Sequence, residues 1–226
     1  MEAVYYSQNP RFYVAVDCII FCFEDGVLKV LLQQRDFEPF RGEHTLMGGF
    51  VQENEDVTQA AQRILEERTG ILYVPLEQVG AFGSPNRDPG ARVVSIAYMA
   101  LVVKHLCNDS LNAKHNGFWV NVYDLPSLSF GHDEMVHKAL ARLRIQIGKT
   151  PVGFQLLPPM FTLSQLQHIH EAILNEHIDK RNFRKRVADM SYIEKTDKIE
   201  KTNRKRGAAL YRYNQLEYEK SLKAKL

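Results

Sequence analysis

The chain has 226 residues, of which 45% are hydrophobic and 25% are charged. This composition is typical of an ordinary globular protein, and the length favours one large domain followed by a smaller one. No stretch reaches the roughly 20 apolar residues that a membrane-spanning helix needs, and residues 1–10 lack the apolar segment of a signal peptide. We therefore expect a cytoplasmic protein with no membrane partner.

Charge is distributed unevenly along the chain. Residues 151–226 contain 15 Lys and Arg against 9 Asp and Glu, a net charge of +6, whereas residues 1–150 contain 14 basic and 18 acidic residues, a net charge of −4. The C-terminal part is therefore the one suited to a polyanion such as DNA. Charge alone is weak support, because a basic surface is more often merely solvated.

The three cysteines are Cys18, Cys22 and Cys107. The first two lie in an apolar, strand-like run, and they have no partners at the spacing of a metal site. We predict that Cys18 and Cys22 are buried free thiols.

The first half of the chain alternates strand and helix patterns. Residues 12–21 and 27–34 are rich in β-forming residues, and the Asp25-Gly26 turn between them predicts a hairpin. Residues 56–69 carry apolar side chains at helical spacing and are followed by a glycine, so they are predicted to form a helix. Later elements are two strands, over residues 92–104 and 117–122, and a helix over residues 132–146. Together they indicate a mixed α/β architecture.

A second unit is predicted beyond the proline at position 151. Two helices are predicted within residues 160–174 and 180–190, with Thr162 and Asp179 as their caps, and each places apolar side chains on one face. Two short strand-like runs joined by a basic tip follow them, which is the pattern of a wing. We therefore divide the chain into a domain of residues 1–150 and a domain of residues 151–226.

The helix predicted over residues 180–190 has two unlike faces. Phe183 and Val187 can pack against the preceding helix, whereas the opposite face is basic and carries one amide. Such a helix suits the major groove of DNA, with its N-terminal end toward the bases, although a solvated basic helix is an equal alternative. The basic tip of the wing can reach phosphates or the minor groove. The candidate DNA-binding residues are Lys180, Arg181, Asn182, Arg184, Lys185, Arg204, Lys205 and Arg206.

Residues 49–71 read GFVQENEDVTQAAQRILEERTGI. This segment resembles the Nudix box, GX5EX7REUXEEXGU, in which U is an aliphatic residue. The positions that agree with the motif are Gly49, Glu55, Arg63, Leu65, Glu67, Gly70 and Ile71. The resemblance implies the Nudix fold, in which helices flank a mixed sheet.

Two departures from the motif concern its chemistry. Nudix hydrolases hold divalent cations with a cluster of helix glutamates, but Ile64 and Arg68 replace two of these glutamates, and only Glu67 of the trio remains. We therefore expect no catalytic residue, no bound metal and no cofactor. Instead, Arg63 and Glu67 are predicted to form a surface pair, and Glu55 is predicted to cap the helix. An active hydrolase of nucleoside diphosphate derivatives is the alternative hypothesis.

The sequence as a whole resembles the Nudix-related transcriptional regulators of the NrtR family. The resemblance rests on residues 85–98, 156–174, 179–190 and 210–213, which follow or belong to a Nudix half. It implies a Nudix domain followed by a winged helix-turn-helix, in a homodimer that binds a palindromic operator under the control of an effector. A protein-interaction scaffold is a weaker alternative.

Members of this family respond to different effectors, so the resemblance implies more than one candidate ligand. Some sense ADP-ribose and others control sugar use, and this sequence is most similar to the arabinose-responsive branch. We therefore expect a pentose such as arabinose, or ADP-ribose.

Carboxylates and amides could hydrogen-bond the hydroxyls of a sugar, whereas arginines could pair with a diphosphate. The candidate ligand-binding residues are Gln34, Arg35, Glu43, Arg87, Asp88 and Arg92. Each has a simpler alternative as a turn or surface residue, and for Asp88, which precedes Pro89, turn formation is the simpler explanation.

Overall fold

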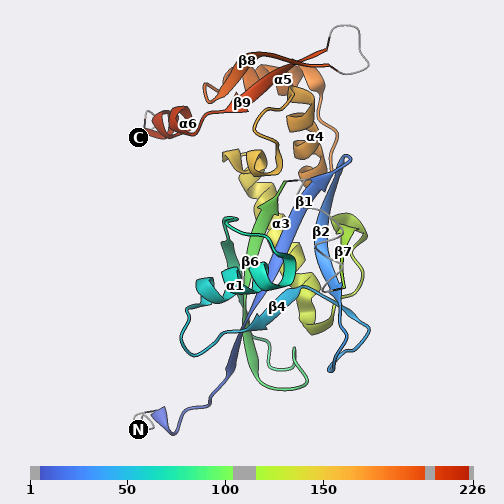
Figure 1. Ribbon diagram of the computed structural model, residues 1–226, viewed down its shortest axis with the longest axis vertical. Coiled ribbons are helices and arrows are strands. Elements are labelled where there is room, and N and C mark those ends of the chain that lie inside the picture. Colours follow the sequence, from blue (N-terminus) through green and yellow to red (C-terminus); the bar gives the residue numbers. More distant parts are fainter. Residues whose placement is uncertain (1–5, 104–115, 202–206, 224–226) are drawn as a thin grey trace. The chain divides into compact units, whose positions relative to one another are not determined.

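The computed structural model of the chain describes residues 6–103, 116–201 and 207–223. The described residues of 1–20, 30–100 and 109–139 form one compact unit, and those of 21–29, 101–108 and 140–226 form a second (Figure 1). None of the helices in the described ranges has the length and apolarity that crossing a bilayer requires.

A seven-stranded sheet is the framework of the N-terminal half. Its strands are β1 (Tyr13–Glu24), β2 (Val27–Gln34), β3 (His44–Thr45), β4 (Met47–Phe50), β5 (Glu77–Phe82), β6 (Val93–Val102) and β7 (Gly117–Asn121). The main path through the sheet is β3-β2-β1-β6-β5, with β4 paired to β1 and β7 paired to β2. The strand β1 contains eight consecutive buried residues, as expected for a strand with both faces covered. The helix α1 (Val57–Thr69) and the first part of α3 (His132–Ile147) supply that cover (Figure 1).

The predicted elements agree with the structure to within a few residues at their ends. The sequence does not predict β3, β4 or β5. The strands β3 and β4 have two and four residues, so they are too short for an alternating apolar pattern to be visible. The strand β5 contains Gly80 and a register shift beside it, and such an irregularity also weakens the pattern.

The helix α1 begins at a capping box formed by Asp56 and Gln59. The Asp56 carboxylate accepts hydrogen bonds from the backbone amides of Thr58 (2.7 Å) and Gln59 (2.9 Å). The prediction that Glu55 caps this helix is therefore wrong by one residue. The helix ends at Gly70, whose φ of 70° is the left-handed conformation that glycine adopts without strain.

The cysteine prediction is confirmed for Cys18 and wrong for Cys22. Cys18 is a buried free thiol, and burial together with the charge of Asp17 raises its pKa to about 12. Cys22 is disulfide-bonded. An apolar run indicates that a thiol is buried, but it carries no information on which side chains face it from other elements.

The C-terminal half is a winged helix. Its elements are the 3-10 helix η5 (Pro151–Leu156), the helices α4 (Leu163–Leu174), α5 (Lys180–Ala188) and α6 (Gln215–Lys223), and the strands β8 (Ile193–Glu200) and β9 (Ala208–Tyr213). Thr162 caps α4 in a capping box with Gln165. The two strands pair antiparallel, and Phe161 pairs with Tyr211 on the other edge of β9. The sequence does not predict α6.

An aromatic cluster holds the two wing strands against η5 and α6. The ring of Phe154 stacks on that of Tyr213 with 4.7 Å between centroids, and Tyr192 lies edge-on to both Tyr213 and Tyr218. Burial, with a smaller effect of the neighbouring tyrosines, raises the pKa of Tyr213 to about 12. The wing is therefore anchored by ring packing as well as by strand pairing.

The contact between β1 and β4 depends on a glycine at position 48. Gly48 pairs with Asp17 across the two strands, and a Cβ atom at Gly48 would lie 2.0 Å from Oδ1 of Asp17. A Cβ atom at Gly49 would lie 2.3 Å from Cδ1 of Ile64. The glycine pair thus allows β4 to approach both a buried carboxylate and the inner face of α1.

We predict that Gly48→Ala destabilises the protein by about 1–3 kcal/mol, the usual cost of overpacking. Urea denaturation of the full chain measures this loss. Gly148→Ala is the matched control, because a Cβ atom there would meet nothing within 4 Å. Equal stability of Gly48→Ala and wild type would show that β4 is free to move away from Asp17.

Candidate functional site

A cavity of about 690 Å³ opens in the first unit, between the sheet, α1 and the start of α3. Its volume lies within the range of about 300–1,000 Å³ that is usual for small-molecule pockets. The ionisable side chains in its wall are Asp17, Arg35, Glu38, Arg63, Glu67, Arg68, Arg87, Asp88 and His132. The site therefore brings together cations and anions from five separate segments.

A buried carboxylate, Asp17, organises the back of this cavity. Its Oδ2 accepts a hydrogen bond of 2.5 Å from Oγ of Ser95 and lies 3.6 Å from Nη2 of Arg87. Its Oδ1 lies 3.4 Å from Nε2 of His132. Burial raises the pKa of Asp17, but His132, Ser95 and Arg87 together outweigh burial, so the pKa lies below its ordinary value. Asp17 is therefore a buried carboxylate anion with three partners.

The proton of His132 can be assigned from its contacts. The backbone N–H of Leu46 donates to Nδ1 of His132 at 3.0 Å, so Nδ1 is an acceptor. The proton is then on Nε2, which faces Asp17. Because His132 is the first residue of α3, this network ties the start of that helix to β1.

Arg87 is almost entirely buried, with 8% of its side chain exposed. Besides Asp17, it contacts the carbonyl oxygen of Phe130, to which Nη1 donates at 3.3 Å. Its buried Nε has no hydrogen-bond partner among the described residues. An unsatisfied donor beside a cavity is an expected place for a ligand acceptor or a water molecule.

On α1, Arg63 holds both remaining motif glutamates. Its Nε and Nη2 bind the two carboxylate oxygens of Glu55 at 2.9 and 2.5 Å, and Nη1 lies 3.2 Å from Glu67. The predicted Arg63–Glu67 pair is confirmed. Arg63, supported by the backbone amide of Gln52, lowers the pKa of Glu55 to about 2 in spite of some desolvation. Both carboxylates are thus already paired with a cation.

The residues present do not fit the divalent cations that the Nudix fold implies. Ile64 is buried with its Cδ1 against Gly49, and Arg68 lines the cavity wall. Within the described part of the chain, no group of three or more His, Cys, Asp or Glu side chains is placed to hold a metal ion. A hard cation needs several free oxygen ligands, and this wall does not supply them.

The structure places Arg35, Arg87 and Asp88 of the six candidate ligand residues in the cavity wall. The guanidinium of Arg35 lies over the rings of Phe37 and Phe130, 4.1 and 4.9 Å from their centroids. Asp88 also accepts a hydrogen bond from the backbone of Gly90, so it serves the turn as well. These three side chains can reach one ligand together.

The other three candidates, Gln34, Glu43 and Arg92, lie outside the lining of this cavity. Gln34 donates to the carbonyl oxygen of Gly42 at 3.0 Å, and Glu43 accepts a hydrogen bond from Ser129. The guanidinium of Arg92 lies 4.9 Å from the ring centroid of Phe12. All three have local partners instead.

The sequence analysis did not identify several residues of the cavity wall. The main ones are Asp17, Arg68 and His132. Asp17 could have been found as the one charged residue within the apolar run of residues 12–21, because a lone charge in a buried strand needs partners. His132 carries no such signal, since only the fold brings it to Asp17.

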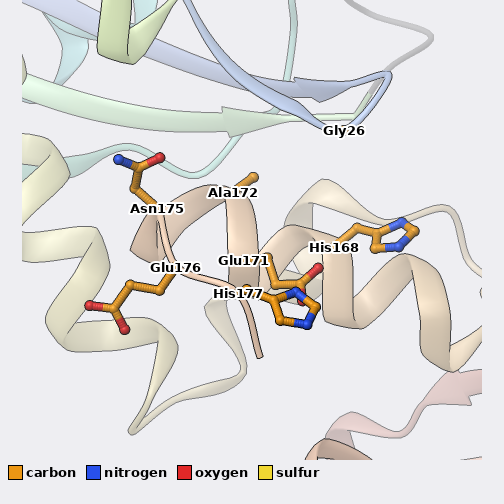
Figure 2. A pocket seen from close by; sticks show the side chains of 7 residues that line it. All are labelled: Gly26, His168, Glu171, Ala172, Asn175, Glu176 and His177. Atoms are coloured by element: carbon orange, nitrogen blue, oxygen red, sulfur yellow. The ribbon is translucent and has the colours of Figure 1, made fainter. Parts of the chain in front are cut away.

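A second hollow of about 500 Å³ lies in the second unit, around the end of α4 (Figure 2). Figure 2 shows Glu171 and His177 side by side, with Nδ1 of His177 3.1 Å from Glu171. Glu171 also accepts hydrogen bonds from Gln167 and from the backbone amide of Ile178. Its carboxylate therefore fixes the turn between α4 and α5.

The helix α5 presents the basic surface that the sequence predicts. Phe183 and Val187 are buried, and Phe183 packs edge-on against His170 of α4. Asp179 caps α5 by accepting from the backbone amide of Asn182 at 2.8 Å. The exposed candidates on this helix are Lys180, Arg181, Asn182, Arg184 and Lys185. The wing-tip candidates Arg204, Lys205 and Arg206 lie outside the described residues.

Comparison with protein families agrees with this architecture. Residues 11–139 match the family model of the NUDIX domain, and residues 153–213 match that of the NrtR DNA-binding winged helix domain. The chain is therefore a Nudix domain followed by a DNA-binding winged helix.

Individual relatives share both parts. An ADPR responsive transcriptional repressor of Acinetobacter baylyi is 34% identical over 217 residues, which cover 94% of this chain and 86% of the relative. The crystal structure of Shewanella oneidensis NrtR complexed with a 27mer DNA is similar with a TM-score of 0.78 and 31% identity, over 91% of this chain and 95% of that one. The ADP-ribose pyrophosphatase of Methanocaldococcus jannaschii is 34% identical over 116 residues, which cover 50% of this chain and 68% of the relative. The protein belongs to the NrtR family of Nudix-related transcriptional regulators.

We predict that the Glu55 carboxyl titrates near pH 2 in the wild-type protein and closer to its ordinary value of 4.5 in Arg63→Gln. Because the folded-state pKa is lowered, the stability from this pair is present above pH 4.5 and is lost as the pH falls toward 2. NMR of the side-chain carboxyl resonances against pH measures both titrations. In the control Arg68→Gln, which has no contact with Glu55, the titration stays near pH 2. Identical midpoints in wild type and Arg63→Gln would contradict the assignment.

Proposed function

We propose that this protein is a cytoplasmic, homodimeric transcription regulator in which ADP-ribose or a close relative, bound in the Nudix cavity, controls operator binding by the winged helix. In this proposal the two domains are residues 1–150 and residues 151–226. One observation carries the proposal: an arginine-rich cavity without the carboxylates of a metal site belongs to the same chain as an exposed basic helix.

The size and charge of the cavity favour a nucleoside diphosphate sugar over a free pentose. Arabinose would occupy a small part of the roughly 690 Å³ and would leave Arg35 and Arg68 without a salt bridge. Guanidinium groups instead suit the oxygens of a diphosphate, which they can bind in pairs. The names of two relatives reported above refer to ADP-ribose, and neither name refers to a pentose. Arabinose therefore serves as the comparison ligand in the binding experiment below.

Aromatic rings at the cavity mouth suit the adenine part of such a ligand. Tyr13, Phe37 and Phe50 line the cavity with 61%, 49% and 50% of their surface exposed. A group of exposed apolar side chains beside a pocket commonly marks a ligand-binding groove. A flat base can stack on them while the diphosphate reaches the arginines.

The residues of α1 support binding without hydrolysis. Cleavage of a diphosphate in a Nudix site needs metal ions that polarise the phosphate and activate water. Glu55 and Glu67 are engaged by Arg63, and Ile64 places a hydrocarbon beside Gly49. The cavity therefore retains ligand recognition as its function.

On the DNA side, α5 supplies the reading surface. In a homodimer, two such helices would enter successive major grooves of a palindromic site, whose half-sites are about one helical turn apart. A ligand that changes the spacing of the two helices would change operator affinity, to the extent of its differential affinity for the two arrangements.

We predict that Arg181→Ala and Arg184→Ala each weaken binding to a duplex that the protein selects from a random pool. A lost phosphate contact lowers the slope of log affinity against log salt by about 1, and a lost base contact costs about 1–3 kcal/mol and relaxes specificity. Fluorescence anisotropy over a salt series distinguishes the two losses. Lys149→Ala, an exposed lysine outside α5, is the control. Equal affinity of the wild-type protein for selected and scrambled duplexes would contradict the proposal.

We predict that ADP-ribose shifts the midpoint of operator binding by about fivefold or more, the lower end of common allosteric coupling, whereas arabinose does not. The same anisotropy assay measures both ligands. ADP-ribose is recovered intact after incubation with the protein and Mg²⁺, as chromatography of the mixture verifies.

The outcomes separate the candidate effectors and functions. A shift by arabinose alone would establish the pentose hypothesis instead. Turnover of ADP-ribose that disappears in Glu67→Gln would establish the hydrolase alternative. Binding of DNA that ignores both ligands would leave the cavity without a regulatory role and would contradict the proposal.

A further inference from the structure

Two arginines in the cavity wall form no salt bridge within 4 Å among the described residues, although Asp88, Asp36 and Glu38 lie near enough to Arg35 to act on its charge. Neither Arg35, at the end of β2, nor Arg68, on α1, forms a salt bridge with any residue in the described ranges. The Nε of Arg35 donates to the carbonyl oxygen of Pro39 at 2.8 Å, and its guanidinium lies between the rings of Phe37 and Phe130. Ring faces attract a cation but do not neutralise it. No carboxylate of the described residues therefore contacts either guanidinium directly, so both can still bind a ligand oxygen.

These two guanidinium groups also repel each other. Burial lowers the pKa of Arg35, the charges of Asp88, Asp36 and Glu38 raise it, and the positive charge of Arg68 lowers it further. Two like charges that face one cavity raise the energy of the empty site. An anion placed between them would relieve this repulsion.

Arg87 adds a third cationic group with unused capacity. Its side chain is more than nine-tenths buried, and Asp17 and Phe130 occupy its terminal nitrogens. Its Nε has no partner within the described part of the chain. This donor is independent of α1, because Arg87 lies in the loop that precedes β6.

The position of Arg68 is informative in itself. In the Nudix box this position holds one of the glutamates that bind metal ions, and the metal in turn neutralises the diphosphate of the substrate. In this chain the side chain of Arg68 supplies a positive charge at the position where the motif has a glutamate and its bound metal ion. Ile64 fills the space beside Gly49 at the other substituted position.

We propose that the cavity binds the diphosphate of its ligand directly through Arg35, Arg68 and Arg87, and that Arg68 takes over the charge-neutralising role of the divalent cation. Binding is therefore independent of metal ions. The inference rests on the proposed function for the presence of a diphosphate in the effector. A planar guanidinium group can donate two hydrogen bonds to two oxygens of one phosphate, which the ammonium group of lysine cannot do with the same geometry. The proposed contacts therefore need arginine rather than lysine.

The test is a calorimetric titration of the full-length chain with ADP-ribose and, separately, with inorganic pyrophosphate. Each ligand is titrated once in EDTA and once in Mg²⁺. We expect dissociation constants that agree within about twofold between the two buffers. Arg68→Gln raises the dissociation constants of both ligands about tenfold or more, as expected for loss of a charged hydrogen bond. Arg68→Lys, which keeps the charge, falls between Arg68→Gln and wild type.

The control is Arg41→Gln, which removes the same charge from an exposed arginine outside the cavity lining. It leaves both affinities unchanged. Circular dichroism and thermal unfolding of Arg68→Gln and Arg68→Lys verify that the variants are folded. A loss of affinity that appears in both Arg68→Gln and Arg41→Gln would reflect net charge alone and would overturn the role of Arg68.

Failure of this inference is distinguishable from failure of the proposed function. Binding of ADP-ribose that disappears in EDTA and returns with Mg²⁺ would overturn the inference and leave the proposed function intact. Metal-free, Arg68-dependent binding of pyrophosphate by a protein whose DNA affinity ignores ADP-ribose would support the inference and overturn the proposed function. Absence of binding by both ligands in both buffers would overturn both.

Discussion

The two-point contact between Arg63 and Glu55 is the interaction on which the site depends, because it fixes α1, which forms one wall of the cavity, to the segment that precedes it. Arg63 also reaches Glu67 and the carbonyl oxygen of Phe50, so one guanidinium joins α1 to the segment after β4. Pairs at the protein surface contribute only about 0–1 kcal/mol. The importance of this pair is therefore geometric: it holds α1 against the end of β4 and the segment that follows it.

The rest of the cavity follows from how closely the backbone segments approach one another. Gly48 and Gly49 allow β4 to pass directly beside Asp17 and Ile64, and Asp17 then holds Arg87 and His132 at the back of the site. The family fold and its concave site are thus retained, while Ile64 and Arg68 stand at two positions where the motif has glutamates.

Much of the fold could be predicted from the sequence, because long elements carry a visible period. The helix over residues 56–69 and the two faces of α5 were identified from apolar spacing. The cap of α1 was misplaced by one residue, since Glu55 and Asp56 are adjacent acids, and only the structure shows that Arg63 draws Glu55 away. The cluster of Asp17, Ser95 and His132 is assembled by strand order and by the start of α3, which short-range patterns do not encode.

Alternation along strands explains which ligand candidates miss the cavity. Gln33 and Arg35 line it while Gln34 between them does not, and Ala91 and Val93 line it while Arg92 does not. Neighbouring residues of an extended chain point to opposite sides. Residue types alone therefore do not show which of these side chains face this cavity, and strand register is needed to tell them apart.

We propose that the cavity and the DNA-binding helix are thermodynamically linked within one chain. Linkage is reciprocal, so the factor by which ADP-ribose changes operator affinity must equal the factor by which operator DNA changes ADP-ribose affinity. The most direct measurement is the dissociation constant of ADP-ribose for the free protein and for the protein saturated with its selected duplex, at one salt concentration. The account predicts two different constants whose ratio matches the shift in operator binding. Identical constants would show that the two domains act independently and would contradict it.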